Sequence, residues 1–194
     1  IRLGIMGFGR ICRQLYRLAA VDPVFEIVAI SDIGRPSILH HLLTHEKGSE
    51  LEVELEGNYL VCEGVKTRLM CTDQPAEIPW DLFQVDAIID ATSRFRAYDE
   101  LEPHLKNGAH RVLMSSLPES DIDRVIIMGV NEADAESGDR IVSAGSATTT
   151  AMAVTLNVLS KKFEIAHATM TSVHAYSSDQ SLQDYAGPDY RRSR

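Results

Sequence analysis

Short apolar runs alternate with amphipathic segments along most of this chain. The runs typical of buried strands lie at residues 1–7, 25–32, 85–92, 110–116, 124–130 and 140–145. Helices are predicted at residues 9–20, 37–45 and 97–107 and from residue 147 onward. The first of these has Ile11, Leu15, Leu18 and Ala19 on one predicted face. Near-continuous apolar strands separated by helices predict an α/β fold with a doubly wound parallel sheet.

Two segments depart from this alternation. Residues 50–71 alternate apolar and polar positions and are broken by Gly57-Asn58 and by Gly64, which predicts a small antiparallel excursion. Residues 168–177 have the pattern of a longer strand with no helix behind it. One strand cannot form a sheet alone, so we expect its partners outside residues 1–194 or in another chain.

Composition and charge narrow the class of protein. Hydrophobic residues make up 44% and charged residues 24% of the 194 positions, as expected for a globular core. A net charge of −9 argues against a nucleic-acid binder, and the basic residues at 191–194 are interpreted as a solvated end. No apolar run approaches 18 residues and the chain opens on a strand, so we expect no membrane segment and no signal peptide.

The cysteines and histidines indicate neither disulfides nor a metal site. Cys12, Cys62 and Cys71 form no C-x-x-C pair, and reduced thiols suit a cytoplasmic protein. We expect Cys62 and Cys71 to lie in the core. Residues 40–45 carry three histidines at helical spacing without a completing cysteine or carboxylate, so they are assigned to a surface helix.

A glycine-rich turn after the first strand suggests a dinucleotide site. Gly7 allows a tight turn, and Gly9 allows a pyrophosphate to approach the backbone at a helix N-terminus. Cys12 stands at the third position of the G-x-G-x-x-G pattern, and a tight turn without a ligand is the alternative. The next strand ends at Asp32, whose carboxylate would bind both ribose hydroxyls and repel a 2′-phosphate, or else would only cap a turn. Together these residues predict a Rossmann-type domain that binds NAD.

Longer motifs resemble one protein family. The segments IRLGIMGFGRIC, PAEIPWDLFQVDAIIDAT, HLKNGAHRVLMSS, IVSAGSATTT and PDYRRSR are similar in order and spacing to glyceraldehyde-3-phosphate dehydrogenases, over essentially the whole chain. Residues 179–180 and the last seven residues more closely resemble the erythrose-4-phosphate dehydrogenase branch. The resemblance implies an NAD-binding domain at residues 1–146. It also implies that residues 147–194 begin an α+β catalytic-type domain whose remainder lies outside this sequence.

The resemblance also marks a missing nucleophile. The family pattern S-N-A-S-C-T-T-N corresponds to SAGSATTT at residues 143–150. Ala147 therefore stands where the family has its acylating cysteine. Further departures from the family pattern are Met6, Ser93, Ala144 and Thr150.

Several other residues acquire implied roles. His174 corresponds to the family's general base, although its own pattern fits a structural or surface histidine equally well. Hydroxyls at the start of the last helix either cap its free amides or bind an anion. The implied phosphate contacts are Ser146, Thr148 and Ser177. The implied cofactor contacts are Gly7, Phe8, Gly9, Arg10, Ile11, Asp32, Thr92 (on the adenine side) and Ser115.

Two functions follow from these residues. The first is an NAD-binding pseudoenzyme, because without sulfur neither the thiohemiacetal nor the thioester of the family reaction forms. The alternative is an NAD-dependent oxidoreductase that acts on a phosphorylated sugar aldehyde by non-covalent hydride transfer, with His174 as the acid or base. The expected partners are a small phosphorylated substrate or inorganic phosphate and, by resemblance, other copies of the chain in a homotetramer. We expect no bound metal, nucleic acid or membrane.

Overall fold

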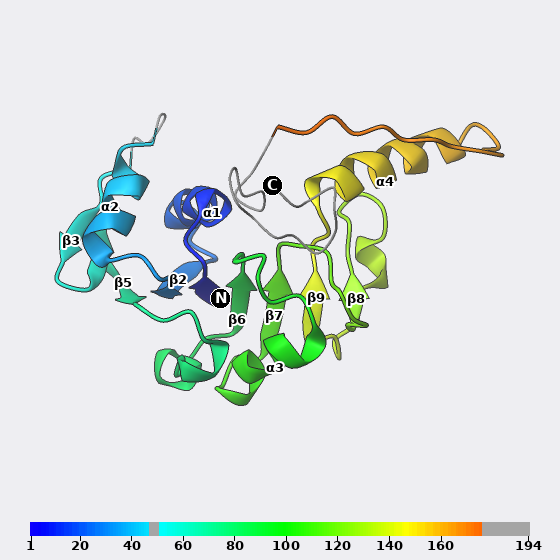
Figure 1. Ribbon diagram of the computed structural model, residues 1–194. Coiled ribbons are helices and arrows are strands. Elements are labelled where there is room, and N and C mark those ends of the chain that lie inside the picture. Colours follow the sequence, from blue (N-terminus) through cyan, green and yellow to red (C-terminus); the bar gives the residue numbers. More distant parts are fainter. Residues whose placement is uncertain (47–50, 176–194) are drawn as a thin grey trace, which may run out of the picture. The chain divides into compact units, whose positions relative to one another are not determined.

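The computed structural model describes residues 1–46 and 51–175 (Figure 1). The chain divides into two compact units, Ile1–Val158 and Leu159–Arg194, and each is described by itself. The first unit contains the sheet and most of the last helix. The described part of the second unit holds the end of that helix, a turn, and a stretch without helix or strand up to residue 175.

Nine strands form one sheet in the described part of the chain, in the order β3-β4-β5-β2-β1-β6-β7-β9-β8. All neighbours from β5 to β8 in this order are parallel, whereas β3–β4 and β4–β5 are antiparallel. The strands are β1 Arg2–Met6, β2 Glu26–Ser31, β3 Glu54–Glu56, β4 Tyr59–Cys62, β5 Val65–Met70, β6 Ala87–Asp90, β7 Arg111–Met114, β8 Arg124–Val125 and β9 Ile141–Ser143. This topology confirms the predicted α/β fold.

Helices cover both faces of the sheet (Figure 1). Helices α1 (Arg10–Ala20) and α2 (Pro36–Thr44) lie on one face and α3 (Tyr98–Lys106) lies on the other, while α4 (Ala147–Ser160) follows β9. Short 3-10 helices lie at Pro75–Glu77, Trp80–Phe83 and Glu132–Asp134. The chain therefore winds back to the sheet on alternate sides, as the doubly wound prediction requires.

Each face of the sheet has its own hydrophobic core. Ile5 of β1 packs in one core with Tyr16 of α1. The next residue, Met6, packs in the other core with Trp80 and with Leu101 of α3. Consecutive strand residues point to opposite faces, so a continuous apolar run such as 1–7 supplies both cores.

The buried face of α1 differs from the predicted one. Cys12, Tyr16 and Ala19 are buried, at the i, i+4 and i+7 spacing of one helical stripe. Ala19 is buried and Leu15 packs against the same core, as predicted. Ile11 and Leu18 are mostly exposed. The prediction was therefore right for two of its four residues, and it missed the cysteine and the tyrosine that fill the space against the sheet.

Three other local predictions need correction. Strand β5 was expected in the antiparallel excursion alone, but it also pairs in parallel with β2 and extends the main sheet. Cys71 is exposed rather than buried, since it follows the last residue of β5. The run at 124–130 forms only the two residues of β8, because the Asn131 amide bonds the Val125 carbonyl and the Ile127 N–H and turns the chain.

The segment predicted as a strand at 168–177 is not a strand over its described part. Residues 168–175 have no assigned strand, and residues 176–177 lie outside the described ranges. An extended segment becomes a strand only through backbone hydrogen bonds to a neighbour. Apolar-polar alternation detects a suitable side-chain pattern but says nothing of the neighbour.

Candidate dinucleotide site

The turn after β1 is shaped by glycine. Gly7 has φ of +85°, and a Cβ at this position would lie 3.0 Å from the backbone nitrogen of Thr92. Its own N–H donates to the Ser31 carbonyl at 2.8 Å. Gly7 is therefore held between the ends of β2 and β6, where a side chain would push the two strand ends apart.

Gly9 plays a different part in the same turn. It is the N-cap of α1, has φ of −72°, and would bring a Cβ into open space with no atom within 4 Å. The first N–H groups of a helix have no intrahelical acceptor and carry the positive end of the helix dipole. Arg10 and Ile11 follow on the exposed side. The turn thus presents bare backbone to solvent at a helix N-terminus, which is the geometry that accepts a pyrophosphate.

Phe8 lies between the two glycines and faces the other way. Its ring is buried and makes an edge-to-face contact with Tyr16, with the centroids 5.9 Å apart. Its backbone N–H donates to Oδ2 of Asp32 at 2.7 Å. The side chain of Phe8 therefore anchors the turn in the core, and only its backbone lies toward the predicted site.

Asp32 joins the ends of β1 and β2. Besides the Phe8 amide, it accepts the N–H of Gly34 at 2.7 Å through Oδ1. A carboxylate has about four acceptor positions, so two protein contacts leave capacity for ribose hydroxyls. The turn-capping role and the ribose role, posed as alternatives from the sequence, are compatible in this geometry.

The loop after β6 forms the opposite wall of the site. Thr92 donates both its N–H and its hydroxyl to Oδ1 of Asp90, at 3.0 and 2.7 Å. Ser93 adopts a left-handed conformation, with φ of +56°, which is strained for a residue with a Cβ. The Arg94 guanidinium forms an ion pair with Asp73 in the loop after β5. These bonds hold the wall close to Gly7.

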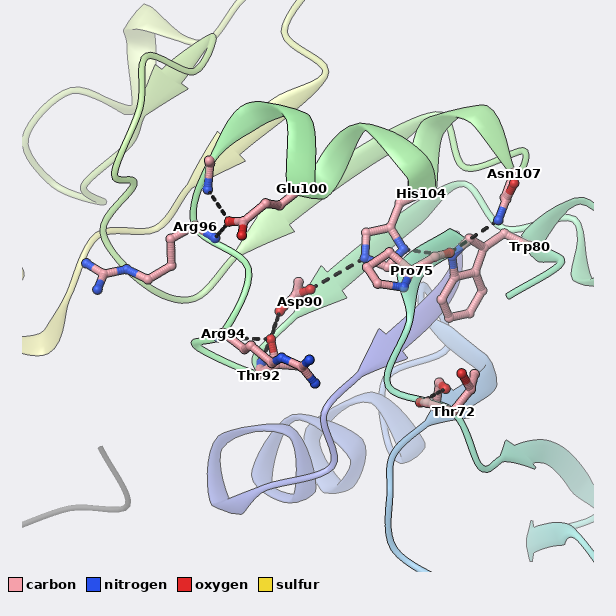
Figure 2. Close-up of polar contacts among 12 residues, drawn as sticks. Thr72, Pro75, Trp80, Asp90, Thr92, Arg94, Arg96, Glu100, His104 and Asn107 are labelled. Atoms are coloured by element: carbon pink, nitrogen blue, oxygen red, sulfur yellow. Dashed lines mark hydrogen bonds and ion pairs between the residues drawn. The ribbon is translucent and has the colours of Figure 1, made fainter. Parts of the chain in front are cut away.

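A buried polar chain lies behind this wall (Figure 2). The Trp80 indole donates to Nδ1 of His104 at 2.9 Å, and Nε2 of His104 lies 3.4 Å from Oδ2 of Asp90. All three side chains are buried. No role was predicted for these three residues from the sequence, although Trp80 and His104 lie in the motifs that carry the family resemblance.

The turn between β9 and α4 contains the position of the missing nucleophile. Gly145 has φ of +71°. Ser146 caps the helix, since its hydroxyl accepts the Thr149 N–H at 3.1 Å and lies 2.9 Å from the Thr149 hydroxyl. Ala147 is the first residue of α4 and is exposed, and Thr148 is half-buried. The capping role predicted for these hydroxyls is therefore realised by Ser146, while anion binding stays a prediction.

The remaining predicted residues are distributed over the chain. Ser115 follows β7, and its N–H donates to the Asp90 carbonyl at 2.9 Å, which places it at the same edge of the sheet as Gly7 and Thr92. His174 belongs to the second compact unit, and Ser177 lies outside the described residues. The contribution of these last two residues to the site stays a prediction.

The cysteines differ in chemical state. Burial, with a smaller contribution from the nearby Asp90 and Asp32 charges, raises the pKa of Cys12 to about 12. Burial likewise raises the pKa of Cys62, with a further contribution from Glu63. Cys71 is exposed, and its thiol lies 3.6 Å from the Ile33 carbonyl. No cysteine of the described residues lies on α4 or in the turn before it.

The residues at this sheet edge fit NAD. Open backbone at the α1 N-terminus suits a pyrophosphate, Asp32 has free acceptor positions for a ribose, and Gly7 keeps the β6 loop close to the turn. By contrast, no cluster of three or more His, Cys, Asp or Glu side chains among residues 1–46 and 51–175 could hold a metal ion. Within the same ranges, no helix combines the length and apolarity needed to cross a membrane.

Comparisons with known proteins agree with this geometry. Residues 1–98 match the family model of the glyceraldehyde 3-phosphate dehydrogenase NAD binding domain, and residues 146–194 match that of its C-terminal domain. The cofactor prediction of NAD is confirmed by the first match.

Similar relatives are also glyceraldehyde-3-phosphate dehydrogenases. The enzyme of Mycoplasma pneumoniae is 36% identical over 197 residues, covering 100% of this chain and 58% of the relative. Glyceraldehyde-3-phosphate dehydrogenase 1 of Bacillus subtilis is 36% identical over 199 residues. The Thermotoga maritima enzyme is 34% identical over 198 residues. Each of these two alignments covers 100% of this chain and 59% of the relative. The chain thus spans a little under three fifths of the length of these relatives. With its glycine turn, its doubly wound sheet and both domain matches, the chain belongs to the glyceraldehyde-3-phosphate dehydrogenase family.

Proposed function

We propose that this protein binds NAD as glyceraldehyde-3-phosphate dehydrogenases do but does not carry out their thioester-forming aldehyde oxidation. The observation that carries the proposal is Ala147 at the first position of α4, where the family pattern has cysteine. A methyl group forms no covalent adduct with an aldehyde. The retained Gly7–Gly9 turn and Asp32 support cofactor binding without that chemistry.

Neighbouring groups offer no replacement for the thiol. The Ser146 hydroxyl is engaged in capping α4 through Thr149. A serine becomes nucleophilic only with a base within hydrogen-bond reach, and its contacts here are an amide and a second hydroxyl. Cys12 and Cys62 have raised pKa values and lie in the core. A covalent intermediate on another side chain is therefore not part of the proposal.

A second function is favoured by the intact cofactor residues. Bound NAD supplies a hydride acceptor, and hydride transfer from an aldehyde hydrate requires orientation and an acid or base rather than a nucleophile. His174 is the residue proposed for the proton, and a phosphorylated sugar aldehyde is the proposed substrate. The erythrose-4-phosphate branch, a homotetrameric assembly, a cytoplasmic location and a domain boundary at residue 146 are further proposals that rest on the resemblance.

One paired experiment tests the proposed function. NAD affinity is measured by calorimetry, and NADH formation is followed by absorbance with glyceraldehyde 3-phosphate or erythrose 4-phosphate, with and without inorganic phosphate. NAD binding without substrate-dependent NADH supports the binding protein. Phosphate-independent NADH formation supports the second function, and absence of NAD binding contradicts both.

Substitutions of the two glycines should separate folding from cofactor binding. Gly7→Ala combines a φ of +85° with a Cβ 3.0 Å from Thr92, and we expect a loss of about 1–3 kcal/mol in the free energy of unfolding. Gly9→Ala enters open space, and we expect a stability change within about 0.5 kcal/mol. It should nevertheless weaken NAD binding by more than about tenfold, because the methyl displaces the pyrophosphate from the helix amides. Denaturant unfolding and calorimetry measure the two effects.

Asp32→Asn tests the choice between NAD and NADP. Asparagine keeps a carbonyl oxygen that can accept the Phe8 or the Gly34 amide, but it removes the charge that repels a 2′-phosphate. We expect the ratio of NADP to NAD dissociation constants to fall by about tenfold or more. The control is Glu26→Gln, which removes an exposed carboxylate at the opposite end of the same strand. Equal affinities for both cofactors in the unaltered protein would refute the role of Asp32.

A further inference from the structure

A chain of buried hydrogen bonds runs from Trp80 through His104 and Asp90 to Thr92 (Figure 2). The chemistry of its donors and acceptors fixes which group donates at each step. An indole Nε1–H can only donate, so Nδ1 of His104 must be the acceptor of the 2.9 Å bond from Trp80. The imidazole is then the tautomer that carries its proton on Nε2. That N–H faces Oδ2 of Asp90 at 3.4 Å, at the long end of hydrogen-bond distances.

The donor-to-acceptor order of these hydrogen bonds also determines what Asp90 does. Its Oδ2 faces the His104 donor, and its Oδ1 accepts both the N–H and the hydroxyl of Thr92. Asp90 therefore accepts at each of these contacts. With 2% of Asp90 and 0% of His104 exposed, solvent does not compete for these bonds, and a reversed or unmade bond would be costly.

Thr92 is the point where this chain reaches the dinucleotide site. Its hydroxyl proton is directed inward to Asp90 at 2.7 Å, and one of its lone pairs accepts the Arg94 N–H at 3.2 Å. The second lone pair is left for a partner that donates. Thr92 also lies against Gly7, where a Cβ would meet its nitrogen and its methyl carbon at 3.0 Å.

We propose that Trp80 and His104 are positioning residues for the dinucleotide: they fix the hydrogen-bond direction of Asp90 and thereby make Thr92 an acceptor toward the adenosine half of NAD. The donor on the cofactor is an adenine amino group or a ribose hydroxyl. The inference rests on the proposed NAD binding, and it adds two residues that lie entirely outside the cofactor groove. Neither Trp80 nor His104 contacts the cofactor itself.

Variants at position 104 test the direction of the chain. Glutamine can accept from Trp80 through its carbonyl and donate to Asp90 through its amide, whereas leucine has a similar size and can do neither. We expect His104→Leu to weaken NAD binding by about tenfold and His104→Gln to remain within about threefold of the unaltered protein. Trp80→Phe, which keeps an aromatic ring but removes the donor, should weaken binding as well. A role in packing alone would order these variants by volume rather than by hydrogen-bond direction.

Matched variants at position 92 test whether the Thr92 hydroxyl accepts a hydrogen bond from the cofactor. Thr92→Ser keeps the hydroxyl and should retain NAD affinity within about threefold, whereas Thr92→Val keeps the shape and should lose about tenfold. The source of the donor is distinguished with the NAD analogue whose adenine is replaced by hypoxanthine. If the amino group is the donor, the unaltered protein binds the analogue more weakly and Thr92→Val removes that difference. If a ribose hydroxyl is the donor, both forms bind NAD and the analogue in an unchanged ratio.

A spectroscopic measurement on the full, unaltered protein completes the test. Long-range ¹H–¹⁵N correlation spectra distinguish the imidazole tautomers, and we expect the Nε2–H form at His104 with a single population. An Nδ1–H or doubly protonated His104 in the unaltered protein would overturn the inference. So would equal NAD affinities for His104→Gln and His104→Leu. Loss of NAD binding in the unaltered protein would contradict the proposed function separately, while the tautomer still decides the direction of the chain.

Discussion

The full protein is expected to convert phosphorylated sugar aldehydes to acyl phosphates on the order of 10⁶-fold more slowly than a cysteine-bearing glyceraldehyde-3-phosphate dehydrogenase. The reason is the methyl side chain of Ala147 at the start of α4. The family reaction passes through two covalent intermediates on sulfur, and removing the nucleophile of a covalent enzyme removes both at once. NAD affinity should be retained, since the Gly7–Gly9 turn and Asp32 belong to a different part of the sheet edge.

The measurement compares this protein with a cysteine-bearing relative under identical conditions. Phosphate-dependent NADH formation is followed at enzyme concentrations high enough to detect a single turnover. A burst of one NADH per subunit, followed by turnover that is limited by phosphate, would indicate an acyl intermediate on some other side chain. A burst with no effect of phosphate would instead fit the non-covalent hydride transfer of the second function. Steady phosphate-dependent turnover within 10³-fold of the relative would contradict the proposed loss of function.

Local sequence patterns predicted most of the sheet. Apolar runs such as 25–32 and 85–92 became β2 and β6, and the glycine pattern located the turn that connects β1 to α1. These predictions succeeded because each depends on neighbours within one element or one connection. The position of Asp32 directly after β2 follows from the same short-range logic, whereas its bond to the Phe8 amide is a contact between two strands that only the structure shows.

The features that were missed depend on partners far apart in the sequence. Trp80, Asp90 and His104 come from a 3-10 helix, a strand and a helix, and only the folded sheet brings them into one chain of hydrogen bonds. The same limit explains the segment at 168–175. Its alternating pattern suits a strand, but a strand also needs a neighbour, and periodicity cannot supply one.

The exposed side of α1 illustrates a third limit. Ile11 is 63% exposed although it is a large aliphatic residue, while the smaller Cys12 beside it is fully buried. Which face of a helix packs against a sheet depends on the shape of the space available and on the turn that starts the helix. Here the turn through Gly9 sets that direction, and it turns Ile11 toward solvent at the edge where the cofactor is expected.

Restoring a thiol at position 147 tests whether this turn still activates a nucleophile. In a Cys71→Ser background, Ala147→Cys would be the only accessible cysteine of the described residues, because Cys12 and Cys62 are buried. The matched control is Ala151→Cys, one turn later on the same helix and also exposed. Both cysteines sit on α4, but only position 147 lies at its N-terminus.

The rate of alkylation separates two sources of activation. A helix N-terminus stabilises a thiolate by about 0.3–1 kcal/mol, which corresponds to a two- to fivefold faster reaction with iodoacetamide at neutral pH. An imidazolium partner lowers a thiol pKa further, so a ratio above about tenfold over Ala151→Cys would indicate His174 as well. His174→Asn in the Ala147→Cys protein should then reduce the ratio to the value of the helix alone. Equal rates at positions 147 and 151 would show that the turn does not activate a thiol.

Dehydrogenase turnover is a stricter demand than thiol reactivity, and we expect Ala147→Cys to restore little or none of it. Met6, Ser93, Ala144 and Thr150 also depart from the family pattern. At Ser93 the φ of +56° shows the consequence directly, since a Cβ now occupies a left-handed position in the wall of the cofactor site. Ser93→Gly added to Ala147→Cys should therefore improve turnover more than Thr150→Asn added to the same protein, because it removes strain beside Thr92. Full recovery by Ala147→Cys alone would show instead that the other substitutions are neutral and that the function was lost by one change.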